Sequence, residues 1–206
     1  GFNPEVGFLL RSAYRKPEAS VYKQFRMNGK FGLLELRPHA TYRAYWNFTG
    51  FQETSYLHVD NHWVWINGLE THTGINFTTE GVVTPFEISE GIIVPTGTYN
   101  HEEAQIVFIT NPSKPLYVST RSILGGSFGG TRYLNTGTLG LRVGDKFNSE
   151  YSLAVNDVNL PAGDFVATIF GARITYSFRP RINLQSFIQY NSEADLWSLN
   201  IRFNLL

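Results

Sequence analysis

Histidine and aspartate side chains gather in one stretch of the chain at a spacing that suits metal binding. His58, Asp60 and His62 occupy every second position, so in an extended strand they project from the same face. His72 follows a turn predicted at residues 67–68, and counting back from that turn places it roughly opposite His62. Imidazole nitrogens and carboxylate oxygens are ligands of zinc and other borderline metals. Two interpretations stay open: a metal site, or polar side chains that fill a hydrophilic face of a sheet.

Catalytic chemistry has weaker support in the sequence. A serine nucleophile needs a histidine and an acid that converge on it, and the chain has no Gly-x-Ser-x-Gly motif. The nearest run, Gly125–Gly130, lies between two predicted strands, where we expect a flexible glycine loop. The connection at residues 80–100 mixes acidic with apolar residues, so we expect it to be ordered and to pack into or over a barrel. We name no catalytic residue and no cofactor, and we favour a protein that is not an enzyme.

Apolar and polar residues alternate through nearly the whole chain, and the last segment shows the pattern most clearly. Its apolar side chains are those of Trp197, Leu199, Ile201, Phe203 and Leu205, with polar residues between them. In a strand the two sets project from opposite faces, so the pattern predicts an all-β protein. The predicted strands span residues 20–27, 34–48, 53–66, 69–79, 103–110, 116–124, 131–143, 147–158, 166–178, 182–191 and 197–205. Residues 5–11 could add a twelfth.

The connections between these strands are predicted to differ at the two ends of the sheet. Short turns are expected at residues 67–68, 111–115, 144–145 and 179–180. Longer links are expected at residues 80–100, 125–130, 157–164 and 191–195. Short turns at one end and longer loops at the other are typical of an up-and-down membrane barrel.

A sheet with one apolar and one polar face can turn either face to its surroundings. A soluble barrel or sandwich packs the apolar face inside, whereas a membrane barrel turns it toward lipid. Long strands, charged residues in the middle of strands and aromatic residues near strand ends favour the membrane. The candidates for the lumen-facing side are Glu35, Arg37, His39, Arg43, Arg173 and Arg202. The candidates for the lipid-facing side or an aromatic girdle are Trp46, Trp63, Trp65, Tyr176, Tyr190, Trp197 and Phe203.

The composition agrees with a two-faced sheet and excludes several classes of protein. The 206 residues include 17 Lys+Arg and 17 Asp+Glu, so the net charge is zero and no nucleic-acid partner is expected. There is no cysteine, which excludes disulfides and thiol chemistry. Charged residues make up 17% and aromatic residues 15%, a low and a high share respectively. No signal peptide is predicted at the start, and no apolar run is long enough for a membrane helix.

Short motifs along the chain resemble the C-terminal region of the bacterial outer-membrane proteins grouped as domain of unknown function 5916. The motifs near the start are Phe2-Asn3-Pro4-Glu5-Val6-Gly7-Phe8, Leu36-Arg37-Pro38 and Gly50-Phe51-Gln52-Glu53-Thr54. Those in the middle are His72-Thr73-Gly74-Ile75-Asn76-Phe77, Pro85-Phe86-Glu87-Ile88 and Gly97-Thr98-Tyr99. The last are Leu160-Pro161-Ala162-Gly163-Asp164-Phe165 and Gln189-Tyr190-Asn191. No single motif is diagnostic; their order and spacing carry the resemblance over almost the whole chain.

The resemblance implies a membrane barrel in the bacterial outer membrane. Members of the family usually carry an N-terminal domain similar to family-9 carbohydrate-binding modules, which this chain lacks, and both ends of the chain are expected to be cut. We therefore expect residues 1–206 to form one porin-like transmembrane β-barrel domain of about 11–12 antiparallel strands, part of a larger barrel. The expected role is that of a pore, anchor or scaffold for a carbohydrate-associated module. Expected partners are outer-membrane lipid, other outer-membrane or periplasmic proteins, and glycans through the missing domain. The alternatives are a soluble ligand-binding β-barrel or sandwich, and an outer-membrane hydrolase.

Overall fold

The computed structural model describes residues 13–205, of which 77% lie in β-strands. The long strands are β4 (Leu33–Asn47), β5 (Gln52–Trp65), β6 (Glu70–Val82), β9 (Gly97–Ile109), β10 (Leu116–Ser127), β11 (Gly130–Val143), β12 (Phe147–Leu160), β13 (Gly163–Arg179), β14 (Ile182–Asn191) and β15 (Leu196–Leu205). The short strands are β1 (Tyr14–Arg15), β2 (Glu18–Tyr22), β3 (Phe25–Arg26), β7 (Phe86–Ser89) and β8 (Ile92–Val94). A single 3₁₀ turn, Lys30–Gly32, precedes β4. Within residues 13–205 no helix has the length and apolar character needed to cross a membrane.

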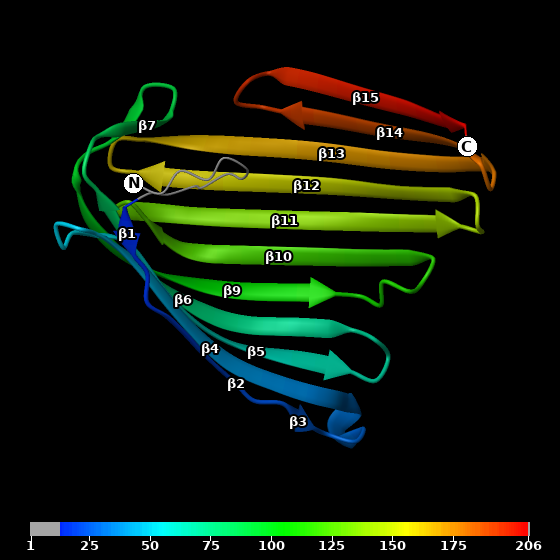
Figure 1. Cartoon of the computed structure of the whole chain (residues 1–206), viewed down its shortest axis with the longest axis horizontal. Coiled ribbons are helices and arrows are strands. Elements are labelled where there is room, and N and C mark those ends of the chain that lie inside the picture. Colours follow the sequence, from blue (N-terminus) through cyan, green and yellow to red (C-terminus); the bar gives the residue numbers. More distant parts are fainter. Residues whose placement is uncertain (1–12, 206) are drawn as a thin grey trace.

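The long strands form one antiparallel up-and-down sheet, as the alternation predicts. Their order is β4-β5-β6-β9-β10-β11-β12-β13-β14-β15, and β1, β2 and β3 all pair with the outer edge of β4. Figure 1 shows the sheet curling, with β2–β6 running obliquely to β10–β15. Over the described residues no pairing joins β15 to β1–β4, so the sheet is open rather than a closed barrel.

Strand lengths agree with the prediction better than the connections do. The ten long strands have 10 to 17 residues each, longer than the ~5–6 residues of an average strand. The predicted strand at residues 20–27 is two pieces, β2 and β3, both paired with β4. The twelfth candidate, residues 5–11, lies outside the described residues.

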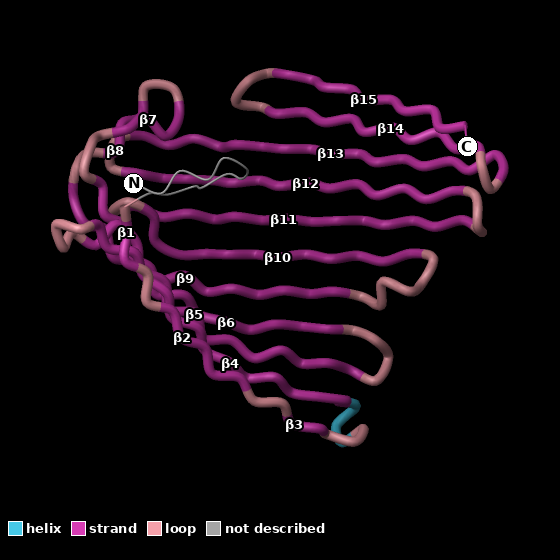
Figure 2. Tube along the Cα trace, viewed as in Figure 1, coloured by secondary structure: helices cyan, strands magenta, loops and turns pink. Residues whose placement is uncertain are grey.

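The expectation of long loops at one end of the sheet is wrong for three of the four links, because only residues 128–129, 161–162 and 192–195 join the strands there. Figure 2 shows that loops gather at both ends of the strands, and only the connection between β6 and β9 is long. Strands β10 and β11 are joined by Phe128 and Gly129 alone, both with positive φ, as tight hairpin turns require. The glycines before this turn, Gly125 and Gly126, belong to β10. They stand where the neighbouring strand leaves no space for a side chain. A Cβ on Gly125 would lie 2.1 Å from the carbonyl oxygen of Glu102.

The connection between β6 and β9 is ordered and carries the hairpin of β7 and β8. Its apolar side chains, led by Ile92 and Val94, pack with Val82, Val158 and Leu160 into a small buried core. Ile88, Tyr99, Phe128 and Phe165 pack against the same core. The connection is therefore ordered, as predicted, and packs against one end of the sheet.

Strand register divides the side chains of the sheet into a polar and an apolar face, because paired residues project to the same side. The row His39, Asp60, Gly74, Gln105 and Ile123 runs across β4, β5, β6, β9 and β10 and defines the polar face. Large apolar residues on the other face are exposed, among them Val59, Ile75, Ile106, Leu124, Leu153, Val166, Leu199 and Ile201. Five of the six buried polar or charged residues within residues 13–205 belong to the polar face, namely Asp60, Asn76, Glu103, Gln105 and Ser127, and the sixth, Ser149, lies on the apolar face. The sheet is thus the reverse of a typical soluble domain, because large apolar side chains are exposed on one face while several polar and charged side chains are buried on the other.

Candidate functional site

The polar face is joined by side chains that reach over an intervening strand. Gln105 of β9 donates a hydrogen bond to Asp60 of β5 over 3.4 Å, passing across Gly74 of β6. Tyr117 of β10 donates to Glu150 of β12 over 2.9 Å, passing across Gly140 of β11. Contacts that skip a strand form where side chains converge, so the polar face is the concave one.

A third such contact is an ion pair. Arg132 of β11 pairs with the buried carboxylate of Glu103 on β9, passing across Gly125 of β10. Each of the three contacts crosses the intervening strand at a glycine, since any side chain there would occupy the same space. Glycine is therefore what permits the polar network to span the sheet.

The histidines singled out in the sequence meet in the middle of this polar face. His58, Asp60 and His62 lie along β5, and the register sets His39 of β4 opposite Asp60 and His72 of β6 opposite His62. The pairing of His62 with His72 is the one predicted from the turn. His39 was predicted on the polar side but not in the cluster, because its position depends on the register between β4 and β5.

Asp60 is the centre of the cluster. Its side chain is 1% exposed, and its Oδ2 lies 3.4 Å from His58 Nε2 and 3.9 Å from His62 Nε2. Ligand atoms of His39, Asp60 and His62 all lie within 4.8 Å of one another. Asp60 Oδ1 accepts a hydrogen bond from the backbone N–H of Thr73 over 3.1 Å, which holds the carboxylate in place.

Each of the three histidines around Asp60 has an oxygen beside its Nδ1 atom. His39 Nδ1 lies 3.3 Å from the carbonyl oxygen of Arg37, and His62 Nδ1 lies 3.2 Å from Glu70 Oε1. His58 Nδ1 lies 2.6 Å from Asn76 Oδ1. Donation from Nδ1 to these oxygens leaves Nε2 of each ring as the free acceptor.

A second group adjoins the first through His62. His62, Glu70 and His72 also bring ligand atoms within 4.8 Å, with His72 Nε2 at 2.9 Å from Glu70 Oε1. The rings of His62 and His72 are stacked, 3.5 Å apart and 3° from parallel. Because ring nitrogens bind in the ring plane, two parallel rings do not direct their lone pairs to one point. This group therefore suits hydrogen bonding and ring support better than direct coordination.

The other lumen-facing candidates also lie on the polar face, away from the histidine cluster or at its rim. Arg37 donates two hydrogen bonds to Glu35, and the Arg43 guanidinium lies 5.0 Å from the centre of the Tyr56 ring. Arg173 lies 5.5 Å from the centre of the Phe187 ring, and Arg202 is paired with Gln185. The structure does not bring these arginines into one charged ring.

The aromatic candidates lie near the two ends of the sheet. Those whose register is regular share the apolar face: Trp63, Tyr176, Tyr190, Trp197 and Phe203. Trp65, at the irregular end of β5, donates a hydrogen bond to Thr71 of the same face. Trp46 follows a register shift between β4 and β5, so the pairing does not place it on either face. Trp197 stacks obliquely on Tyr190 with ring centres 4.8 Å apart.

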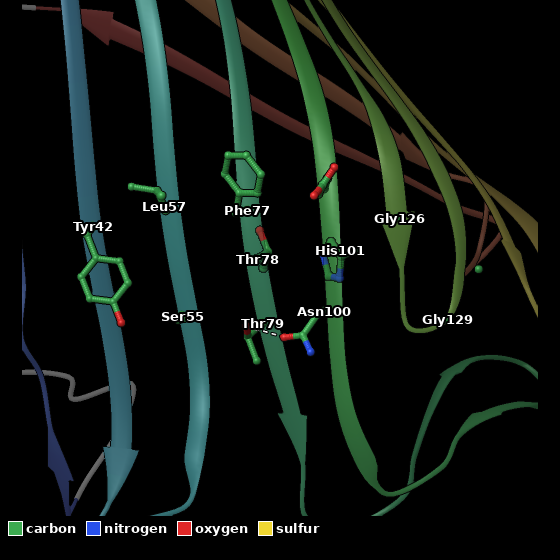
Figure 3. A pocket seen from close by; sticks show the side chains of 12 residues that line it. Tyr42, Ser55, Leu57, Phe77, Thr78, Thr79, Asn100, His101, Gly126 and Gly129 are labelled. Atoms are coloured by element: carbon green, nitrogen blue, oxygen red, sulfur yellow. Dashed lines mark hydrogen bonds between the residues drawn. The ribbon is translucent and has the colours of Figure 1, made fainter.

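A depression of about 670 Å³ on the apolar face, shown in Figure 3, adds no converging chemistry. Tyr42, Leu57 and Phe77 form one row along it, and Thr79 donates a hydrogen bond to Asn100 in the next row over 2.7 Å. Across residues 13–205, no hydrogen bond joins a serine hydroxyl to a histidine ring, so no serine nucleophile is assembled.

Three contributors to the polar site were missed in the sequence. Glu70 and Asn76 orient His62 and His58, and Gln105 reaches Asp60 from two strands away. Glu70 and Asn76 have the same strand parity as His72, a signal that could have found them. Nothing in the sequence indicates Gln105, because its contact depends on the pairing of β6 with β9.

Comparison of the chain with protein-family models, with curated proteins and with solved structures finds no match. The functional argument therefore rests on the geometry of the two faces.

Proposed function

We propose that this chain forms the wall of a bacterial outer-membrane β-barrel, with its apolar face toward lipid and its polar face toward the lumen. The observation that supports the proposal is the reversed sidedness of the sheet. Side chains such as Ile201 are 62% exposed on one face, while Glu103 is 5% exposed on the other. Exposed apolar surface on this scale requires a covering, and a band of lipid covers all sides of a barrel at once.

Strand length supports the same proposal. A tilted strand of ~9–11 residues crosses the apolar layer of a membrane, and the ten long strands have 10 to 17 residues. The aromatic side chains near strand ends lie where girdles form at the two interfaces. A soluble barrel or sandwich, the alternative, would have to cover the apolar face with a second layer, and the described residues contain no such layer over it.

Within the barrel proposal, the chain acts as a pore, anchor or scaffold without catalysis of its own. The polar face has the hydrogen-bonded network that a lumen wall needs, and in the described part of the chain no serine hydroxyl is hydrogen-bonded to a histidine ring on it. The resemblance to the domain of unknown function 5916 family adds the proposal that the barrel serves a carbohydrate-associated module and contacts other envelope proteins.

A pair of neighbouring cysteines tests the sidedness directly. The chain has no cysteine, so Val166→Cys and Ala167→Cys each introduce a unique thiol for a spin label, on the apolar and polar face of β13 respectively. In lipid vesicles we expect the label at 166 to be relaxed by oxygen, which enters lipid, and the label at 167 by a water-soluble relaxation agent. Equal accessibility of both labels to the water-soluble agent would contradict the proposal.

The same vesicles separate a pore from an anchor. Steady conductance steps in a planar bilayer would support a pore, and a sealed bilayer with correctly sided labels would support an anchor or scaffold. Extraction that needs detergent, with heat-dependent migration on a gel, is expected in both cases.

A further inference from the structure

We propose that His39, His58, Asp60 and His62 form a site for one divalent transition-metal cation of the zinc class, on the polar face at mid-height of β4 and β5. The proposal goes beyond the barrel function and does not depend on it, because the site opens to water on the concave face whichever medium covers the other face. It rests on the donor set, on the spacing of the donors, and on the groups that orient them.

The donor set selects the class of cation. Three imidazoles and one carboxylate are ligands of zinc, copper, nickel or cobalt, whereas calcium and magnesium prefer oxygen alone. His39 comes from β4 and the other three donors from alternate positions of β5, so one cation would join two neighbouring strands.

Three of the donors gather around one point: ligand atoms of His39, Asp60 and His62 lie within 4.8 Å of one another, and His58 adjoins them through Asp60. Zinc ligands at ~2.0–2.1 Å from the metal stand about 3.3 Å from one another. His58 Nε2 and Asp60 Oδ2 are 3.4 Å apart, and His62 Nε2 and the same oxygen are 3.9 Å apart. The rings of His39 and His62 are not stacked but stand at 83° to each other, with their centres 5.0 Å apart.

The orientation of the histidines is already that of metal ligands. In metal sites the ring nitrogen that does not bind the metal donates to a carboxylate, amide or backbone oxygen, which fixes the ring. Glu70 stands beside His62 Nδ1, Asn76 beside His58 Nδ1 and the Arg37 carbonyl beside His39 Nδ1. Asn76 is itself held by Glu103, toward whose Oε2 its amide nitrogen donates over 3.5 Å.

Titration of the full chain with zinc chloride tests the proposal. The protein is purified without a histidine tag, and binding is followed by calorimetry, with cobalt(II) as a second probe whose visible absorption reports tetrahedral coordination. We expect one zinc per chain, a tetrahedral cobalt spectrum, and no displacement by excess calcium.

Four variants locate the site. Asp60→Asn and His62→Gln remove ligands while keeping side-chain volume, and each is expected to weaken zinc binding by more than ~100-fold. Glu70→Gln removes only the group that orients His62 and is expected to weaken binding by ~10–100-fold. His101→Gln is the matched control, since His101 lies on the polar face of β9 outside the cluster, and it should bind zinc as the unmodified chain does.

Circular dichroism on each variant separates loss of the site from loss of the fold. If Asp60→Asn does not fold, the His62→Gln and Glu70→Gln variants, together with the cobalt spectrum of the unmodified chain, still decide the matter. The proposal is overturned if the unmodified chain binds no zinc, if His101→Gln is as damaging as His62→Gln, or if folded ligand variants bind zinc undiminished.

Discussion

Single glycines decide how far the polar network of this sheet extends. Tyr117 reaches Glu150 only because Gly140 stands between them, and Gln105 reaches Asp60 only because Gly74 does. Glycine within a strand weakens the strand, so its presence marks a place where something else approaches closely. Here the approaching group is a polar side chain from the neighbouring strand.

Substitution of Gly140 by alanine tests this role. The added Cβ would lie 1.8 Å from Tyr117 Cε1, so the ring must move and its hydrogen bond to Glu150 is lost. We expect the free energy of unfolding to fall by ~1–3 kcal/mol, measured by denaturant titration.

Gly137 of the same strand is the matched control. A Cβ at this position would meet nothing within 4 Å, so Gly137→Ala should leave stability unchanged or raise it by up to ~1 kcal/mol. Equal destabilisation by both substitutions would show that the cost comes from the strand backbone and not from the network.

At the scale of elements, the hairpin of β7 and β8 is held to the sheet by few side chains. Val94 is 2% exposed and belongs to the small core with Val82 and Val158, whereas its neighbour Ile93 is 55% exposed. We therefore expect the hairpin to open as a separate cooperative unit, without disturbing the strands beneath it.

Val94→Ala is expected to loosen the hairpin by ~1–2 kcal/mol, because it removes buried methyl groups. Hydrogen exchange should speed up over residues 83–96 and stay unchanged in β12. Ile93→Ala, which alters an exposed side chain of the same strand, should have little effect. Faster exchange throughout the sheet in Val94→Ala would mean that the hairpin and the sheet unfold together.

Substitutions in the middle of the last strand, β15, test which face of the sheet meets lipid. Ile201 and Asn200 are neighbours in sequence and project to opposite faces. If the apolar face meets lipid, Ile201→Arg should impair assembly into vesicles by ~2–4 kcal/mol, since it places a charge near the middle of the membrane. Asn200→Arg, which faces the polar side, should assemble normally. Normal assembly of a soluble Ile201→Arg variant would refute the proposed orientation.

At the scale of the whole molecule, the sheet has two free edges, and the membrane proposal requires that both become paired. Within residues 13–205, strand β15 pairs only with β14, and the opposite edge consists of the short strands β1–β3 and the parts of β4 that they leave open. Lipid does not hydrogen-bond to exposed backbone groups, so an open edge is not stable within a membrane. In the membrane the two edges must therefore pair, with each other or with further strands.

Hydrogen exchange measures whether this pairing occurs. In detergent micelles or vesicles we expect the amides of β15 to exchange as slowly as those of the central strand β12. Fast exchange confined to β15, in a chain whose spin labels report the proposed sidedness, would show that the edge stays open and that the barrel is incomplete.

Some of the structure could be predicted because it depends on parity alone. Side chains of a strand alternate between two faces, so the polar set of Glu35, Arg37, His39 and Arg43 follows from counting residues. The pairing of His62 with His72 follows from a turn at residues 67–68, since a hairpin turn sets the register of its two strands. The local sequence pattern therefore predicted the long strands, their faces, and three of the four residues of the cluster around Asp60, counting Asp60 itself: His58, Asp60 and His62.

The predictions from sequence were wrong where glycines lie within strands, because contacts with strands far away in the sequence determine the local structure there. The run Gly125–Gly130 has the composition of a loop, yet it lies mostly in strands. Glycine is needed there because the backbone of β9 and β12 approaches too closely for a side chain.

The sequence by itself determined that the protein is an antiparallel sheet with one apolar and one polar face, because a period of two is a property of each strand alone. Only the tertiary structure decided that His39 joins the cluster around Asp60, that Gln105 reaches it across Gly74, and that the polar face is the concave one. Those features depend on strand register and sheet curvature, which arise from the packing of residues far apart in the chain. For the same reason, the open edges could be seen only once all strands were in place.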